Sequence, residues 1–309
     1  MLAIHDNNHS VLCRVSSSIG FLKPYISEKT NKPMKKILVP CDFSAPAIEA
    51  FKFAIDMASQ SGGSVHVLKV VELPVINESA LGFPAYAFDA GLMKELREDG
   101  EKKYKKMVDL FGKGFAKTTF SVVVGPMTPT VRDFIIDKKC DLVVMGTHGS
   151  TGLAEFFVGS NTEKMVRFST VPVFAIRKAV PFKSIKSIVF PTSLELNQGD
   201  FIKKLKLLQE FFEAKLHILF LNTPFNFIRD QDLKDYAAHY KFTNFSLNIR
   251  NDRYEPDGII SFATEVKADM LAMATHGRKG LSHFVSGSIT EDVVNHVQCP
   301  VWTYSIRKK

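Results

Sequence analysis

Residues 141–149 read DLVVMGTHG, and after nine further residues the chain continues with GSNTEKMV at 159–166. The apolar run at 141–145 is typical of a buried parallel strand, and the stretch from 160 onward favours a helix. Glycines between a strand and a helix let backbone N–H groups approach an anion closely. The stretch therefore predicts a parallel α/β fold with a phosphate-binding turn built from Gly146, Gly149, Gly159 and Ser160.

This Gly-x2-Gly-x9-Gly-Ser spacing resembles the nucleotide-binding signature of the universal stress protein family. Two further stretches are similar to that family: KKILVPCDFS at 35–44 resembles its first strand and loop, and VPVFAI at 171–176 resembles its last strand. The resemblance runs from about Met34 to the C-terminus. It implies two tandem Rossmann-like domains of the adenine nucleotide alpha hydrolase type and an adenine nucleotide as the ligand.

Composition narrows the class of protein. The length of 309 residues is typical of about two domains, and 45% hydrophobic with 23% charged residues is typical of a folded globular chain. No uncharged apolar run reaches the ~20 residues that a membrane helix needs, so a membrane is not predicted as a partner. The net charge of +8 would allow nucleic-acid binding, but the lysines are scattered along presumed helices, as at 101–106. A solvated helix surface is the favoured interpretation of these lysines, because no nucleic-acid-binding signature accompanies them.

The four cysteines lie far apart and form no CxxC pair. This usage is typical of reduced thiols in a cytoplasmic protein. Cys41 follows the predicted first strand, beside the proposed site, so a redox role stays open for it alone. The alternative is an inert core residue, which is the more common state of an isolated cysteine.

The chain contains two copies of one unit. Residues 187–193 repeat the pattern of 37–42, residues 275–277 repeat 147–149, and residues 287–288 repeat 159–160. Pro40 and Pro191 are 151 residues apart, whereas Gly149 and Gly277 are only 128 apart. The second copy is therefore 23 residues shorter, and we place the shortening between its second and third strands.

Three segments follow from these observations. Residues 1–33 show no sustained periodicity and are expected to be a poorly ordered extension, with Met34 as an alternative start of the protein. Residues 34–180 are expected to form the nucleotide-binding domain, and residues 181–309 a second domain with a degenerate motif.

Each copy is expected to alternate five strands with four helices, which implies a parallel sheet covered on both faces. In the first copy, strands are predicted near 36–41, 64–71, 118–124, 141–146 and 172–177, and helices near 45–61, 90–112, 128–139 and 160–169. Ligands of open α/β sheets lie beyond the carboxyl ends of the strands, where the strand order reverses. Asp42, Val70 and the turn from Gly146 to Gly149 all fall at that edge.

The family resemblance assigns a place to each of these residues. It implies that Asp42 lies on the adenine–ribose side, with Pro40, Cys41 and Val70 lining that end of the ligand. The alternative for Asp42 is a charge at the start of a helix capped by Ser44. The resemblance further implies that Met145, Gly146 and His148 lie nearer the ribose, and that the phosphates face Gly149, Gly159, Ser160 and Thr162. Asn161 is also predicted to bind the nucleotide.

Two residues in this set have competing roles. Residues 160–163 read as a capping box that starts at Ser160, and 288–291 repeat it. His148 could act as a general base, but no Asp, Glu or second His stands beside it in the sequence. A structural or backbone role is therefore favoured for His148, and no catalytic residue is predicted.

The second copy departs from the pattern at two points. Ala274 replaces the first glycine, and Ser193 stands where Asp42 would be. The lost carboxylate removes a polar contact, so we expect a site that is weakened or repurposed. A weak second site would use residues that match the phosphate half of the motif, namely Thr275, His276, Gly277, Gly287, Ser288 and Thr290.

The sequence thus predicts a cytoplasmic stress-response protein that binds ATP, AMP or ADP, with or without Mg²⁺, in its first domain. Bound nucleotide would act as an occupancy signal, with slow hydrolysis at most, because the chain has no GxxxxGK[ST] loop and no obvious carboxylate pair for Mg²⁺. No metal-ligating residue is predicted.

Two other functions compete with this prediction. An adenylating enzyme of the PP-loop type is disfavoured, because PCDFS at 40–44 lacks the SGGxDS-type loop. A nucleotide-free interaction scaffold remains the second alternative. For assembly, we predict that 173–176 pairs with 301–304 inside one chain as a pseudo-dimer. A homodimer is the alternative assembly, and the sequence points to no particular protein partner.

Overall fold

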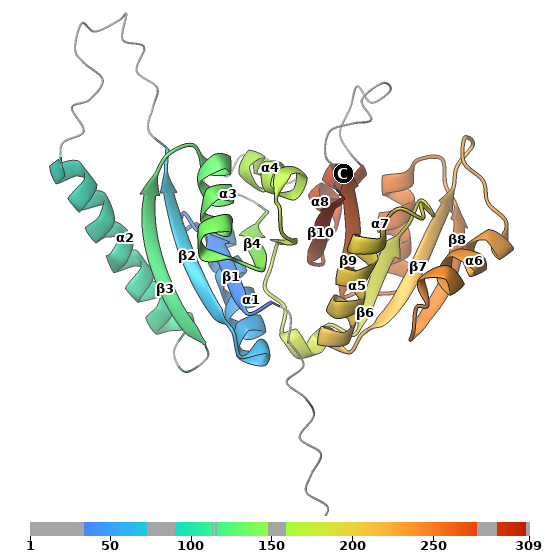
Figure 1. Ribbon diagram of the computed structural model, residues 1–309, viewed down its shortest axis with the longest axis horizontal. Helices are drawn as coiled ribbons and strands as arrows, with labels where there is room; N and C mark the ends of the chain where they lie inside the picture. Colours follow the sequence, from blue (N-terminus) through green and yellow to red (C-terminus); the bar gives the residue numbers. More distant parts are fainter. Residues whose placement is uncertain are drawn as a thin grey trace, which may run out of the picture. The chain divides into compact units, whose positions relative to one another are not determined.

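A computed structural model of the chain describes residues 34–72, 90–112, 114, 116–147, 159–276 and 289–306. The predicted extension 1–33 lies outside the described residues. Within them, strands and helices alternate along the chain (Figure 1). The first copy consists of β1 (Lys36–Pro40), α1 (Ala45–Ser61), β2 (Ser64–Val71), α2 (Ala90–Phe111), β3 (Lys117–Val124), α3 (Met127–Lys138), β4 (Leu142–Gly146), α4 (Ser160–Phe168) and β5 (Val173–Ile176).

The second copy repeats this order after a short 3₁₀ helix, η2 (Phe182–Ser184). It consists of β6 (Ser187–Pro191), α5 (Gly199–Phe212), β7 (Lys215–Asn222), α6 (Asp230–Tyr240), β8 (Phe245–Asn251), α7 (Glu255–Glu265), β9 (Met270–His276), α8 (Ile289–His296) and β10 (Val301–Ile306). The predicted shortening between the second and third strands is confirmed. There α6 has 11 residues, whereas its counterpart α2 has 22.

The described strands form one ten-stranded sheet in the order β3-β2-β1-β4-β5-β10-β9-β6-β7-β8. All neighbours within a copy pair in parallel, and only β5 and β10 pair antiparallel. Trp302 lies opposite Phe174 at this junction. The predicted pairing of the two last strands is therefore confirmed, and it covers two sheet edges that would otherwise be open.

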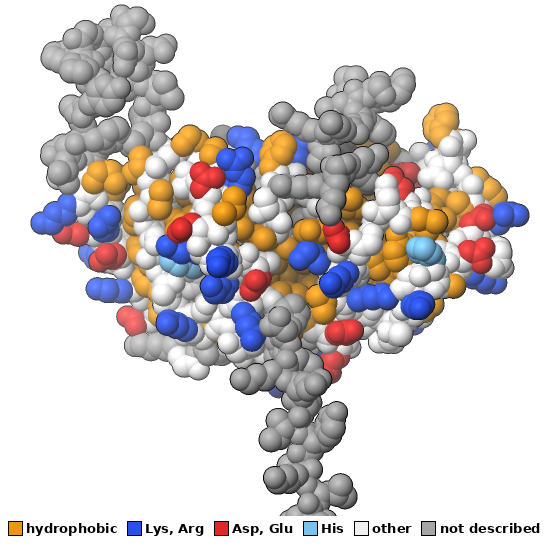
Figure 2. All heavy atoms as spheres, in the orientation of Figure 1, with side chains coloured by type: hydrophobic (Ala, Val, Ile, Leu, Met, Phe, Trp, Pro, Cys, Tyr) orange, Lys and Arg blue, Asp and Glu red, His pale blue; other side chains and the backbone are white. Residues whose placement is uncertain are grey.

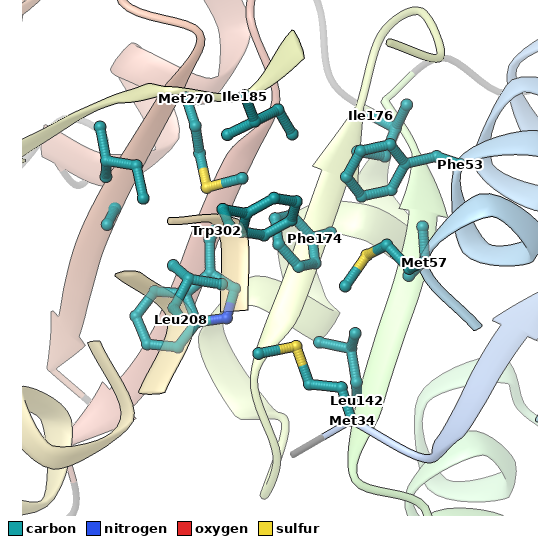
Figure 3. Close-up of a cluster of buried hydrophobic side chains, with 14 of the residues drawn as sticks. Met34, Phe53, Met57, Leu142, Phe174, Ile176, Ile185, Leu208, Met270 and Trp302 are labelled. Atoms are coloured by element: carbon teal, nitrogen blue, oxygen red, sulfur yellow. The ribbon is translucent and has the colours of Figure 1, made fainter. Parts of the chain in front are cut away.

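Helices cover the sheet on both faces, as Figure 1 shows. The largest cluster of buried side chains draws on α1, α2, α5 and α6, and it runs through both copies. Two smaller clusters use α3 with α4 in the first copy and α7 with α8 in the second. Figure 3 shows Trp302 and Phe174 beside one another within the large cluster, with Phe53 and Met57 of α1 on one side. The two copies thus share a hydrophobic core.

Local sequence explains where α1 begins and ends. The hydroxyl of Ser44 accepts a hydrogen bond from the Ala47 N–H, which confirms Ser44 as the cap, and Pro46 stands in the first turn. At the other end, Gly62 adopts the left-handed conformation with φ of 66°. None of the helices in the described part of the chain combines the length and the apolar character that crossing a bilayer requires.

Candidate functional site

The site lies at the carboxyl ends of β1 and β4, where the strand order of the first copy reverses. These two strands are hydrogen-bonded neighbours, with Ile37 opposite Leu142 and Leu38 opposite Val143. Because they run in parallel, the chain leaves both at the same edge of the sheet. Asp42 and Gly146, which are far apart in the sequence, are thereby brought to one edge. This is the position at which open α/β sheets bind ligands.

Two hydrogen bonds join the end of β4 to the start of α4. The Gly159 N–H donates to the carbonyl oxygen of Thr147 over 2.6 Å. The Thr162 hydroxyl donates to the carbonyl oxygen of Gly146 over 2.7 Å. The amino end of α4 is therefore held directly at the site edge. The first backbone N–H groups of a helix lack intrahelical partners and carry a partial positive charge, so this edge favours an anion.

Gly146 is required by packing rather than by its φ angle. A Cβ atom at this position would lie 2.5 Å from both the carbonyl carbon and the oxygen of Pro46, in the first turn of α1. Such an approach is too close for any side chain. Gly146 therefore allows the end of β4 to lie directly against the first turn of α1. Sequence reasoning did not identify Pro46 as the residue that excludes a side chain at position 146.

In the turn after β1, Phe43 has a positive φ of 65°, and it is one of eight non-glycine residues in the described part of the chain that do so. Three of the others are helix C-caps, so this conformation shapes the turn and does not by itself mark a functional site. The Phe43 N–H donates to the Cys41 sulfur over 3.4 Å, and Ser44 N–H donates to Asp42 Oδ1 over 2.9 Å. These bonds hold the turn and leave the Asp42 side chain exposed at the edge.

The second copy builds the same turn from different residues. Leu194 has φ of 60°, and its N–H donates to the Thr192 hydroxyl over 3.1 Å. Thr192 thus takes the place of Cys41 in holding the turn. Nothing in the sequence signalled the positive φ, because neither Phe43 nor Leu194 is a glycine, asparagine or aspartate.

Cys41 is buried with 5% of its surface exposed. The pKa of its thiol is raised from 9.0 to about 12, mainly because the side chain is buried. A thiol with so high a pKa is rarely a thiolate and reacts slowly with oxidants. The inert interpretation of Cys41 is therefore favoured over a redox role.

The remaining predicted residues of the first copy fall into three groups. Pro40 and Met145 are buried at the ends of β1 and β4, and Val70 is half-buried near the end of β2. Ser160 is exposed and Asn161 half-buried in the first turn of α4, whereas Thr162 is buried. His148 and Gly149 lie outside the described residues, so their assignment stays a prediction.

The predicted capping box at Ser160 is wrong. Gly159 occupies the N-cap of α4, and Ser160 is already the first helical residue. The Gly159 carbonyl accepts hydrogen bonds from the N–H groups of Thr162 and Glu163. The bond from Gly159 to Thr147 fixes this cap, and such a long-range contact is not visible in the local sequence. The repeat of the box begins at Ser288, outside the described residues.

The predicted weak second site is only partly described. Thr275 is buried, and its hydroxyl donates to the carbonyl oxygen of Val166 in α4 of the first copy over 3.3 Å. Its side chain therefore contacts the other copy. Thr290 is also buried, and Ser193 is exposed. His276 ends β9, but its side chain, Gly277, Gly287 and Ser288 lie outside the described residues.

One charged residue near the site was missed by sequence reasoning. The Lys69 ammonium lies 5.4 Å from the centre of the Phe43 ring, and its positive charge acts on Cys41. The position of Lys69 in the predicted strand 64–71 did not indicate that its ammonium group lies near the site. For metals, no cluster of three His, Cys, Asp or Glu side chains occurs among the residues with described positions, and no role is derived for Mg²⁺.

Comparison of the sequence with known proteins points to the universal stress proteins. The sequence model of the Universal stress protein family matches residues 33–177 and 233–305. Universal stress protein MJ0531 of Methanocaldococcus jannaschii is 33% identical over 145 residues, which cover 47% of this chain and 82% of the relative. Universal stress protein Slr1230 of Synechocystis sp. is 24% identical over 293 residues, covering 88% of this chain and all of the relative (100%).

A solved structure supports the same fold. The crystal structure of a universal stress protein from Archaeoglobus fulgidus DSM 4304 aligns with a TM-score of 0.67 at 16% identity, covering 88% of this chain and 98% of that one. The match of the family model to both copies, together with the relative that spans both, identifies a tandem arrangement. The chain belongs to the universal stress protein family.

Proposed function

We propose that the first copy binds an adenine nucleotide, ATP or its relatives AMP and ADP, and that occupancy of this site is a signal in a stress response. The observation that carries the proposal is the pair of hydrogen bonds from Gly159 to Thr147 and from Thr162 to Gly146. They hold the amino end of α4 at the strand-order reversal. The family's glycine spacing, from Gly146 to Ser160, occurs in full in this copy.

In this proposal the phosphates lie at the amino end of α4, where Ser160 and Asn161 offer backbone N–H groups. The adenine and ribose lie toward Asp42 and Val70 at the ends of β1 and β2. From the family's sequence pattern alone, we assign His148 to the ribose and Gly149 to the phosphates. The residues assigned to the site do not include the groups that catalyse rapid phosphoryl transfer, so we propose slow hydrolysis at most.

We further propose a stoichiometry of one nucleotide per chain. In the second copy Ser193 stands where the first copy has the carboxylate of Asp42. This difference removes one polar contact from a ligand, which is worth about 0.5–1.5 kcal/mol.

The test is ATP titration of the full chain by calorimetry, with Gly159→Val as the variant. Gly159 has φ of −57°, which valine can adopt, so the backbone does not forbid the substitution. The branched side chain would stand where the phosphates approach, and we expect affinity to fall at least about tenfold, or roughly 1.4 kcal/mol. Gly199→Val is the matched control, since Gly199 also lies at a helix start and has no heavy atom near its Cβ position.

Unchanged ATP affinity in Gly159→Val would refute the site assignment. A wild-type chain that binds no adenine nucleotide, and carries none in a native mass spectrum after gentle purification, would favour the scaffold alternative. Two nucleotides per chain would refute the proposed stoichiometry.

A further inference from the structure

Exposed apolar side chains gather at one end of the second copy. Six large hydrophobic side chains are exposed among the described residues, and four of them follow three adjacent strands of that copy. Leu196 follows β6, Phe225 and Phe227 follow β7, and Tyr254 follows β8. Because these strands pair in parallel, their carboxyl ends share one edge. We call these four residues the apolar rim.

Phe225 is the extreme member of the rim. It is 98% exposed and Phe227 is 77% exposed. Hydrophobic side chains project at the end of the second copy in Figure 2, where Figure 1 shows the connection between β7 and α6. Single exposed apolar residues are common on protein surfaces, whereas large exposed apolar patches are typical of interaction sites.

The connection that carries the two phenylalanines is held in shape by hydrogen bonds. Thr223 and Asn226 exchange backbone bonds of 2.8 and 3.2 Å, and the Phe225 N–H donates to the Thr223 hydroxyl over 3.3 Å. The Ile228 N–H donates to Asn222 Oδ1 over 3.1 Å. A side chain presented on a preformed turn loses little entropy when a partner covers it.

The segments that carry the apolar rim are acidic, although the whole chain is basic. Segments 192–200, 222–232 and 251–257 contain seven carboxylates and two arginines, a net charge of −5, against +8 for the chain. One arginine, Arg229, is paired with Asp232 over 2.9 Å. Some of these acidic residues could serve only to stabilise a helix, because a negative side chain in the first turn interacts favourably with the helix dipole. However, α1 and α3 of the first copy form without any, so helix formation alone does not require them.

From this combination we infer that the apolar rim is a docking surface for a basic, amphipathic segment of a partner protein. The exposed phenylalanines would be covered by apolar side chains of the segment, and its lysines or arginines would face the surrounding carboxylates. Complementary charge of this kind speeds association and excludes acidic partners. In this inference the second copy binds a partner protein, whereas the first copy carries the proposed nucleotide site.

The test uses two labelled synthetic peptides with the full chain and reads fluorescence anisotropy. One peptide combines lysine with leucine, and the other replaces every lysine by glutamate. We expect the lysine peptide to bind and the glutamate peptide not to bind. Unspecific attraction would not produce this result, since the protein's net charge repels a basic peptide. Added salt should weaken the binding.

The double variant Phe225→Ser/Phe227→Ser should reduce affinity for the lysine peptide at least about tenfold, because exposed aromatic residues dominate such interfaces. Its unfolding midpoint should equal that of the wild type, since both side chains already face water. The control is Leu110→Ser/Ile136→Ser, two residues of the first copy that are 62% and 63% exposed. It should bind the peptide like the wild type.

Three results would overturn the inference. The glutamate peptide could bind as well as the lysine peptide, or the double variant could retain full affinity. Sedimentation velocity could also show that the wild type self-associates while Phe225→Ser/Phe227→Ser does not, which would assign the rim to a second copy of this chain.

Discussion

Gly146 shows how one residue connects the sequence pattern to the site. A side chain there would collide with the backbone of Pro46, 2.5 Å away. We expect Gly146→Ala to lower the free energy of unfolding by about 1–3 kcal/mol, the usual cost of forcing extra atoms into a packed region. Urea denaturation measures this loss. Gly199→Ala is the control, because nothing lies within 4 Å of its Cβ position.

The second copy explains why alanine is allowed at the matching place. There α5 begins at Gly199, eight residues after β6 ends at Pro191, whereas α1 begins five residues after β1. The first helical turn is thus displaced along the chain, and Ala274 is accommodated half-buried. If Gly146→Ala were as stable as the wild type, the packing explanation for this glycine would be wrong.

His66 gives the fold a dependence on pH. Its ring nitrogens are hydrogen-bonded to the hydroxyls of Thr119 (2.7 Å) and Ser121 (3.0 Å), and its ring lies 4.6 Å from that of Phe134. Burial, followed by the charge of Lys138, lowers the pKa of His66 from 6.5 to about 4. The folded state therefore favours the neutral ring. Its contribution to stability is complete above about pH 6.5 and is lost as pH falls toward 4.

The measurement compares wild type with His66→Gln by urea denaturation across this pH range. Glutamine does not titrate, so the stability advantage of the wild type should shrink between pH 6.5 and 4. His239→Gln, at an exposed position on α6, serves as the control. An advantage that stays constant over the range would contradict the assignment of His66.

Among the elements, α4 depends on its bond to β4. The Thr162 hydroxyl donates to Gly146 O over 2.7 Å, and Thr162 is 3% exposed. Thr162→Val keeps the shape but leaves this buried carbonyl without its donor. We expect a loss of about 1–3 kcal/mol in unfolding free energy. Because α4 is then less firmly held at the site, ATP affinity should fall as well. Thr162→Ser retains the hydroxyl and should restore both properties, and failure of this rescue would argue against the bond.

The elements of the first copy could be predicted from sequence to within one residue at each end. Continuous Val, Ile and Leu runs marked the buried strands, and local signals such as Ser44 marked helix ends. The start of α4 at Ser160 was predicted correctly, but its N-cap was mistaken, because Gly159 and Ser160 can both cap a helix and a bond from Gly159 to Thr147 decides between them.

Other features of the candidate site could not be predicted because they depend on contacts between distant segments. The approach of Pro46 to Gly146 depends on how α1 crosses β4. The contact of Thr275 with Val166 depends on how the two copies pack together. The glycine spacing and the sheet edge were readable in the sequence, whereas the partners of individual side chains were not.

At the scale of the molecule, the two copies are joined through strands and side chains. Phe174 of β5 packs 5.2 Å from Phe53 in the first copy and 6.4 Å from Phe212 in the second, measured between ring centres. The Thr303 hydroxyl donates to the Val173 carbonyl across the same junction over 3.3 Å. A core shared in this way should make both copies unfold together.

The single tryptophan of the chain, Trp302, reports on this junction, where it is 1% exposed. We expect its fluorescence and the far-UV circular dichroism of the whole molecule to change at the same urea concentration, as in two-state unfolding. Phe174→Ala should lower that common midpoint by the equivalent of about 3–5 kcal/mol. Phe262→Ala, a buried change confined to the second copy, should also shift both signals together. If instead the dichroism showed two steps, or if Phe262→Ala moved only part of it, each copy would be an independent folding unit and the junction only a contact between them.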